Sequence, residues 1–274
     1  MSLSGVAAKR LRVAIFGGHG RMGSLVSQSI ENSPDLDLIA RLDRRDSPDL
    51  ALDADVIVDF THPDSVLENI KWALDSGKDL VVGTTGFDET RLSIVRDWVE
   101  ATTPKRGVFI ISNFSVSAVL VTQFAAAAAP FFDNVEIIDF AHNRKAEAPS
   151  GTSIDTAHAI AAARVKAGVA SSADATMIET PGARGASISD VPIHSLRLVG
   201  LVSHQEVLLG SIGELLTLRF DTLDRSAYMA GVLLAIRAVT GRPGLNLGLE
   251  SLLHLPEPGQ IDGTTAEPES PTNS

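Results

Sequence analysis

The sequence contains no cysteine among its 274 residues, which excludes disulfides, thiolate zinc sites and cysteine nucleophiles together. It has no apolar run long enough to cross a bilayer, and its first ten residues lack the apolar core of a secretory signal. Basic residues are few, 23 against 34 acidic ones, and the net charge of −11 argues against a nucleic-acid partner. These absences predict a cytoplasmic protein that binds neither membrane nor nucleic acid.

Short apolar runs alternate with helical patterns through the first part of the chain. The runs occupy residues 11–16, 36–42, 56–60, 80–82 and 108–111, and the helical patterns lie at 22–30, 63–76 and 89–102. Strands that alternate with helices are typical of a parallel, doubly wound sheet. We therefore expect residues 1–112 to form a Rossmann-type α/β domain that binds a dinucleotide.

The pattern changes after Asn113. Helical patterns at 116–132 and 153–166 flank a strand-like run at 135–140, and β-type runs follow at 175–179, 194–201, 205–210 and 214–221. Successive strands without long helices between them favour a mixed, mostly antiparallel sheet. This predicts a second, α+β domain over residues 113–225.

The C-terminal part divides into two segments. Helical patterns at 226–239 and 247–253 predict that residues 226–254 return to cover the first domain. Residues 255–274 are rich in Pro, Glu, Thr, Ser and Gly and hold too little apolar surface to fold, so we expect a disordered tail.

A glycine-rich loop follows the first predicted strand and opens the first predicted helix. Glycine lets the backbone approach a pyrophosphate closely, and the helix start offers it free amides. A strand-to-helix turn that needs glycine for steric reasons alone is the other interpretation, but the acidic Asp43 after the second strand favours a nucleotide. The predicted phosphate-binding residues are Gly17, Gly18, His19, Gly20, Arg21 and Met22.

Asp43 stands where a carboxylate can bind the ribose hydroxyls of a dinucleotide. Arg44 follows it directly and can bind a ribose 2′-phosphate, although Arg44 and Arg45 also fit a pair of solvated surface arginines. The sequence therefore predicts that NADPH is accepted alongside NADH.

A second polar loop, residues 141–152, lies between a predicted strand and a predicted helix. Ser150, Gly151 and Thr152 stand at the helix start, where free amides and hydroxyls suit a carboxylate, with Lys145 and Arg144 as nearby cations. An ordinary N-cap beside solvated basic residues is the alternative. The loop predicts an anionic small-molecule substrate.

Four other polar residues, three histidines and an arginine, also suggest roles in the structure or the site. We expect His194 and His204 to be structural or interface residues, His62 to serve either the cofactor site or its own turn, and Arg184 to be a mobile contact for substrate or a neighbouring subunit. No cluster has metal-ligand spacing, so we predict no metal.

The chain resembles the dihydrodipicolinate reductase (4-hydroxy-tetrahydrodipicolinate reductase) family from Val13 to about Leu253. The matching motifs are the glycine loop, DFTHP from Asp59, GTTG from Gly83, SNFS from Ser112, KAEAPSGT from Lys145 and GLVSHQEVLLG from Gly200. The resemblance implies an NAD(P)H-dependent reductase of a cyclic imine-like carboxylate in lysine and diaminopimelate biosynthesis. It also implies a homotetramer joined through the sheet of the second domain.

The resemblance further implies roles for individual residues. Lys145 matches the family's proton-donating lysine, and His142, Gly151 and Thr152 match substrate-binding positions. The residues that would line the nicotinamide are Gly83, Thr84, Thr85, Ile111, Ser112, Asn113 and Phe114.

The sequence departs from the family pattern at Ala141, where the first histidine of His-His-x-x-Lys usually stands. Alanine cannot transfer a proton. Milder departures are Ser112 for proline, Ser117 for glycine and Glu147 for aspartate. Three interpretations follow: a reductase of the family's own substrate, a divergent reductase of another cyclic imine, and a non-catalytic dinucleotide-binding protein.

Overall fold

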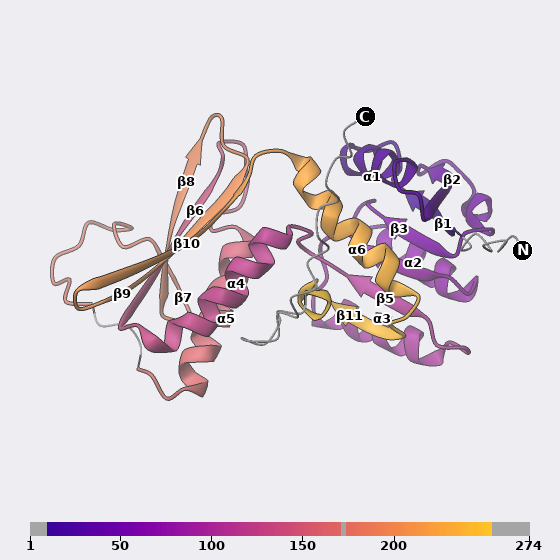
Figure 1. Cartoon of the computed structure of the whole chain (residues 1–274). Helices are drawn as coiled ribbons and strands as arrows, with labels where there is room; N and C mark the ends of the chain where they lie inside the picture. The colour runs from indigo at the N-terminus through magenta and orange to yellow at the C-terminus, as the bar shows by residue number, and fades with distance from the viewer. Residues whose placement is uncertain (1–9, 171–173, 254–274) are drawn as a thin grey trace, which may run out of the picture.

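The computed structural model describes residues 10–170 and 174–253, which form two sheets, each covered by its own helices (Figure 1). In those residues no helix is both long and apolar enough to cross a membrane. The N-terminal residues 1–9 and the predicted disordered tail at 255–274 lie outside the described residues.

The first sheet is parallel and has six strands in the order β11-β5-β4-β3-β1-β2. Its strands are β1 (Leu11–Phe16), β2 (Leu36–Leu42), β3 (Val56–Asp59), β4 (Asp79–Val82), β5 (Gly107–Ile110) and β11 (Gly244–Leu247). Its helices are α1 (Arg21–Glu31), α2 (Val66–Asp75), α3 (Glu89–Ala101) and α6 (Met229–Val239), with a 3-10 turn η1 (Pro48–Ala51) after β2.

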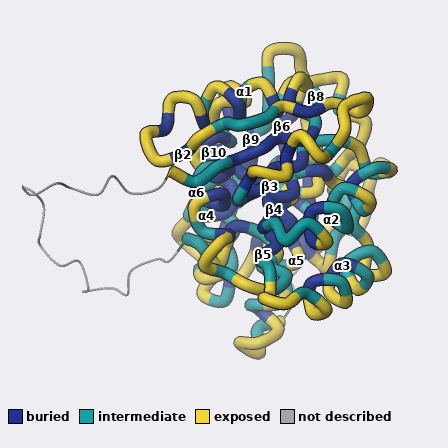
Figure 2. The backbone as a smooth tube through the Cα atoms, turned by 90° about the vertical axis from the view of Figure 1, so that its right-hand side faces the viewer, coloured by how far each residue is buried: buried dark blue, intermediate teal, exposed yellow. Residues whose placement is uncertain are grey.

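Alternate side chains of β1 show why this sheet is covered on both faces. Val13 and Ile15 pack with α1 and α6, whereas Ala14 and Phe16 pack with α2 and α3. Strands buried on both faces are continuously apolar, and β3, β4 and β5 are buried throughout (Figure 2). The predicted Rossmann-type doubly wound sheet is confirmed.

The second sheet has five strands in the order β10-β9-β6-β8-β7, of which only the β6–β8 pair is parallel. Its strands are β6 (Asn134–His142), β7 (Ala186–Ile188), β8 (Val191–Leu198), β9 (Ser203–Ser211) and β10 (Glu214–Thr222). Two helices cover one face, α4 (Val116–Ala128), followed by η2 (Ala129–Phe131), and α5 (Gly151–Lys166). The predicted mixed, mostly antiparallel sheet is confirmed.

One predicted strand of this sheet is wrong. Residues 175–179 have no strand conformation, and β7 lies further along the chain. The apolar side chains of that run, Met177 and Ile178, are 94% and 95% exposed. An apolar run becomes a strand when it packs on a core and pairs with a neighbouring strand, and these exposed side chains pack on no core.

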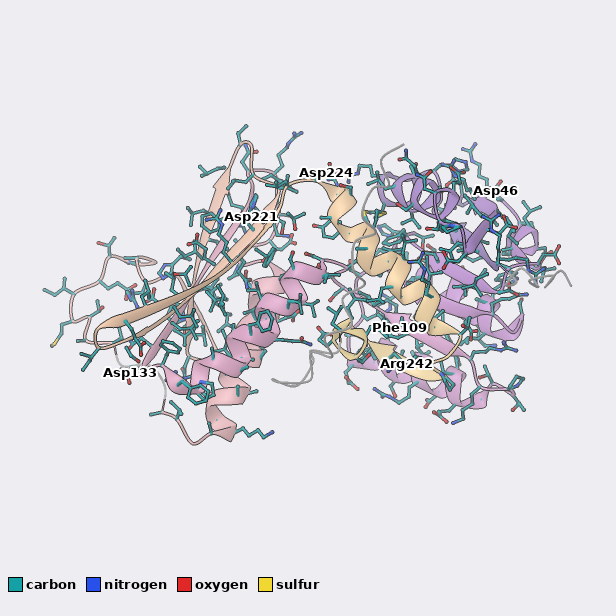
Figure 3. The ribbon with its side chains drawn as sticks, in the orientation of Figure 1. Asp46, Phe109, Asp133, Asp221, Asp224 and Arg242 are labelled. Atoms are coloured by element: carbon teal, nitrogen blue, oxygen red, sulfur yellow. The ribbon has the colours of Figure 1, made fainter. Side chains whose placement is uncertain are left out.

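After β10 the chain passes through η3 (Arg225–Tyr228) into α6, which packs on the first sheet. Asp224, labelled in Figure 3, marks this crossing point between the two halves. The helix predicted at 247–253 is wrong: β11 pairs parallel to β5, and only a short η4 (Glu250–Leu252) follows it. Leu249 is nevertheless buried. The helix-like spacing of apolar residues in this segment therefore comes from the end of a strand followed by one 3-10 turn.

Candidate active site

The glycine loop joins β1 to α1 in a conformation that other residues would not tolerate. Gly17 has a φ of +76°, and a Cβ there would lie 2.4 Å from the carbonyl oxygen of Phe60. A Cβ at Gly23 would lie 2.1 Å from the carbonyl oxygen of Gly17. The N-cap of α1, Gly20, offers no side-chain cap to the amides of the first turn. The α1 start is therefore suited to bind a pyrophosphate.

A cavity of about 760 Å³ lies beside this loop. Asp43 and Arg44 line it, and Nδ1 of His19 lies 3.0 Å from Oδ2 of Asp43 at its rim. These residues and the α1 start together fit a dinucleotide: amides for the phosphates, a carboxylate for a ribose and a guanidinium beside it.

Sequence reasoning missed much of the cavity wall. Besides His62, the segment after β3 and helix α2 supply Thr61, Asp64, Ser65, Glu68, Asn69 and Trp72. His62, for which two roles were open, lines the cavity and also accepts the amide of Asp64 in its own turn, at 3.3 Å to Nδ1. The available signal was the position of this segment after β3, since parallel strands end at one edge of a sheet. Arg41, also missed, donates to the carbonyl of Gly18 at 3.0 Å.

A fully buried carboxylate, Asp59, holds the next part of the site. It accepts hydrogen bonds from the amide of Thr61 at 3.0 Å, the hydroxyl of Thr84 at 2.6 Å and Nδ2 of Asn69 at 2.7 Å. Four polar contacts, including the Thr61 hydroxyl at 2.8 Å, satisfy a charge that would be costly to bury alone. Asp59 thereby fixes the turn that carries Thr84 and Thr85.

The two predicted nicotinamide segments lie next to each other. The amide of Ile111 donates to the carbonyl of Val82 at 2.9 Å, directly before Gly83. The ring of Phe60 lies 5.6 Å from that of Phe114, and a Cβ at Gly83 would lie 2.1 Å from the Phe60 ring. Gly83 is required at that position because the phenylalanine ring fills the space.

The predicted proton donor, Lys145, forms an ion pair with Glu147 across the polar loop after β6. The hydrogen bond from Lys145 lowers the pKa of Glu147 below its usual range. His142 is exposed at the end of β6, and its Nδ1 accepts the amide of Arg144 at 3.2 Å. The side chain of Lys145 is 24% exposed, so most of its length is covered by the protein.

The start of α5 is built from the three predicted substrate residues. Ser150 is the N-cap, accepting the amide of Ser153 at 3.3 Å, and its own amide donates to Asp139 at 2.9 Å. A Cβ at Gly151 would have no heavy atom within 4 Å, so the backbone there faces open space. The amide and hydroxyl of Ser150 are therefore occupied by hydrogen bonds within the protein, whereas the backbone of Gly151 is accessible to a ligand.

Thr152 connects this helix start to the turn after β5. Its hydroxyl accepts a hydrogen bond from Nδ2 of Asn113 at 3.0 Å. The tertiary structure therefore brings together a residue predicted for the cofactor and a residue predicted for the substrate.

Two residues that sequence reasoning missed hold the polar loop of residues 141–152, the predicted substrate loop, in place. The guanidinium of Arg197 on β8 donates to the carboxylate of Asp139 at 2.8 Å and to the carbonyl of Glu147 at 3.0 Å. Asp139 is buried, and it also accepts from the hydroxyl of Ser195 at 3.2 Å. No sequence spacing signals this pair, because the β6–β8 pairing alone brings the two residues together.

The remaining residues singled out in the sequence lie elsewhere on the second sheet. Arg184 forms ion pairs with Glu136 and Asp174, and Nε2 of His194 lies 2.7 Å from Glu136. Nδ1 of His204 lies 2.7 Å from Asp221 on the adjacent strand. The described ranges contain no group of three or more histidines and carboxylates arranged to hold a metal ion.

Comparison with known families matches both halves of the chain. Residues 11–114 match the model described as dihydrodipicolinate reductase, N-terminus, and residues 117–253 match that described as dihydrodipicolinate reductase, C-terminus.

Curated relatives cover most of the chain. The 4-hydroxy-tetrahydrodipicolinate reductase of Cutibacterium acnes is 48% identical over 245 residues, which is 89% of this chain and 99% of the relative. That of Nocardia farcinica is 48% identical over 247 residues, again 89% and 99%.

A solved structure of the family is similar in fold over most of this chain. The dipicolinate-bound dihydrodipicolinate reductase from Paenisporosarcina sp. TG-14 is 36% identical, with a TM-score of 0.78 over 89% of this chain and all of that one. GenD2 from gentamicin A biosynthesis, solved with NAD, is 15% identical with a TM-score of 0.56 over 86% of this chain and 88% of its own, a likeness of fold alone.

Proposed function

This chain belongs to the dihydrodipicolinate reductase family, and on that premise we propose that it reduces 4-hydroxy-tetrahydrodipicolinate to tetrahydrodipicolinate with NADPH or NADH. The structural observation that supports the proposal best is the hydrogen bond between Asn113 and Thr152. It places the start of α5, suited to a carboxylate, beside the turn that follows β5 of the Rossmann-type sheet. A hydride donor and an anionic acceptor bound at these two places would be neighbours.

The chain's own residues suit the cofactor. In our proposal the α1 start holds the phosphates, Asp43 holds a ribose and Arg44 a 2′-phosphate. The nicotinamide would lie against the turns at 83–85 and 111–114, which Asp59 and Phe60 support. When bound, NAD(P)H supplies the hydride that the protein's side chains cannot provide.

The substrate loop provides the remaining functions. Lys145 carries the proton that the reduced product needs, and His142, Gly151 and Thr152 orient the substrate carboxylate. Ser150 serves the site by beginning α5, since its amide and hydroxyl bind Asp139 and Ser153. Glu147, held by Lys145, keeps that ammonium group near the loop.

Ala141 favours a second candidate function, reduction of another cyclic imine. Its side chain is 2% exposed within β6, so this position holds no proton-transferring group. Under either function Lys145 is the side chain we assign to proton donation, because it matches the family's proton-donating lysine and its ammonium group lies in the polar loop beside Glu147.

We also propose that the protein assembles as a homotetramer through the second sheet. Helices α4 and α5 cover one face of that sheet, and the other face carries exposed Leu196, Leu198 and Leu215. Apolar side chains on an uncovered sheet face favour packing against a second sheet. A cytoplasmic location suits a chain without cysteine.

A substrate panel tests the proposed function. Purified protein is given NADPH and freshly generated 4-hydroxy-tetrahydrodipicolinate, and the loss of absorbance of the reduced cofactor is followed. Turnover with this substrate is the expected result. Turnover only with other cyclic imines would support the second candidate function, and tight NADPH binding without any turnover would contradict both.

A further inference from the structure

Asn113 occupies the junction between the two halves of the molecule, in the short segment between β5 and α4. Its side chain makes two hydrogen bonds. Oδ1 accepts the amide of Ser115, the N-cap of α4, at 2.9 Å, and Nδ2 donates to the hydroxyl of Thr152 at 3.0 Å. The amide of Asn113 therefore links the start of α4 to the start of α5.

These contacts fix the direction of the Thr152 hydroxyl. The amide of Ser115 can only donate, so it must face the carbonyl oxygen of the Asn113 side chain, and the NH2 group must face Thr152. The Thr152 oxygen thus accepts from Asn113 and keeps its own hydrogen available for another acceptor.

The second turns of α4 and α5 are also held together. The hydroxyls of Thr122 on α4 and Thr156 on α5 lie 2.8 Å apart, and that of Thr156 donates to the carbonyl of Thr152 at 2.8 Å. The backbone of Thr152 is therefore held in place, and the rotation of its hydroxyl is the freedom that Asn113 removes.

We propose that Asn113 is a positioning residue that turns the hydroxyl hydrogen of Thr152 toward the carboxylate of the substrate. This inference rests on the proposed function, which places that carboxylate at the α5 start. A preoriented donor binds an anion without first reorganising, and a hydrogen bond to a charged acceptor is stronger than a neutral one. Because Asn113 lies in the turn assigned to the nicotinamide, the same residue aligns the substrate with the cofactor.

Asn113→Asp reverses the hydrogen bond with almost no change of shape. The new carboxylate still accepts the Ser115 amide, but it can only accept from Thr152, whose hydrogen then turns away from the substrate. We expect the affinity for dipicolinate, measured by calorimetry, and kcat/KM to fall about ten-fold or more, the scale of one charge-assisted hydrogen bond. The unfolding midpoint stays near that of the wild type, because the contact with the Ser115 amide is kept.

The added negative charge is separated from the hydroxyl orientation by a double-mutant cycle with Thr152→Val. If Asn113 acts through the hydroxyl, the loss caused by N113D shrinks strongly in the T152V background. A loss of equal size in both backgrounds would assign the effect to charge alone and overturn the inference. Thr152→Ser keeps the hydroxyl, and we expect it to restore most of the affinity that T152V loses.

A replacement variant and a separate binding measurement keep the result interpretable. If N113D does not fold, Asn113→Ala takes its place in the cycle, and we expect a smaller loss because the hydroxyl then rotates freely. Dipicolinate binding is measured whether or not the wild type turns over. An inactive wild type with an intact binding cycle would contradict the proposed function alone, whereas an active wild type matched by N113D would contradict this inference alone.

Discussion

The guanidinium of Arg197 and the carboxylate of Asp139 lie 2.8 Å apart beneath the substrate loop, with side chains only 17% and 3% exposed. Through this pair, β8 and β6 hold the second half of the loop, because Arg197 binds the Glu147 carbonyl and Asp139 binds the Ser150 amide. The geometry of the proposed carboxylate site thus depends on a buried ion pair outside it.

Removal of one partner of this pair should destabilise the protein strongly. Arg197→Met leaves a buried carboxylate without its cation, and we expect a loss of about 3–5 kcal/mol in the free energy of unfolding, measured with denaturant. The control, Arg237→Met, breaks the pair with Asp35, whose side chains are 44% and 49% exposed, and should cost about 1 kcal/mol or less. Equal losses for the two variants would contradict this account.

Lys145→Met should impair turnover without impairing cofactor binding. Loss of a proton donor lowers kcat by about 10²–10⁴-fold, and the affinity for NADPH stays unchanged because the α1 start is untouched. Lys105→Met, at a surface pair with Glu100, serves as the control and should retain wild-type activity. Near wild-type turnover of the Lys145 variant would show that the proton comes from elsewhere.

Arg44→Ala should separate the two cofactors. Arg44 lines the cavity beside Asp43, so its removal should weaken NADPH binding by about ten-fold or more, the scale of a charged hydrogen bond, and leave NADH affinity unchanged. Calorimetry with each cofactor measures this. An unchanged NADPH affinity would refute the role assigned to Arg44 and favour a solvated surface arginine.

Gly151→Ala tests whether the open space at the start of α5 receives the substrate. The added methyl meets no protein atom within 4 Å, so the unfolding midpoint should not fall. A bound carboxylate would meet that methyl, and we expect dipicolinate affinity to drop about ten-fold by the loss of a charge-assisted hydrogen bond. Gly241→Ala, where a Cβ would lie 3.7 Å from the carbonyl oxygen of Ala238, is the matched control. Unimpaired binding in both variants would remove Gly151 from the site.

Asp79 predicts a pH dependence of stability. Burial raises the pKa of its carboxyl above the ordinary 3.8, against the hydrogen bond from the amide of Gly107. The unfolded state then loses this proton at lower pH than the folded state, so the contribution of Asp79 to stability declines as pH rises from about 3.8 through the folded pKa.

Asp79→Asn removes this titration and keeps an oxygen for the Gly107 amide. We expect the variant to gain stability relative to the wild type as pH rises from acidic to neutral, in denaturant unfolding at several pH values. A stability difference that does not change with pH would refute the assignment.

The sequence by itself determined the two kinds of sheet and the two helix starts. The β1–loop–α1 segment was predictable because strand, glycines and helix are contiguous, and Ser150 and Thr152 were found because an N-terminal helix turn is a local feature. Residues 175–179 and 247–253 were misread because local apolar spacing does not say whether a pairing strand is present.

Only the tertiary structure decided which of these local features meet. Arg197 reaches Asp139 through the pairing of β8 with β6, Asp59 reaches Thr84 through that of β3 with β4, and Asn113 reaches Thr152 because α4 packs on α5. A hydrogen bond acts over about 3 Å, whereas the residues it joins here are 58, 25 and 39 positions apart in the chain. The register of the strands and the packing of the helices bring these residues into contact, and neither can be read from the local spacing of residues in the sequence.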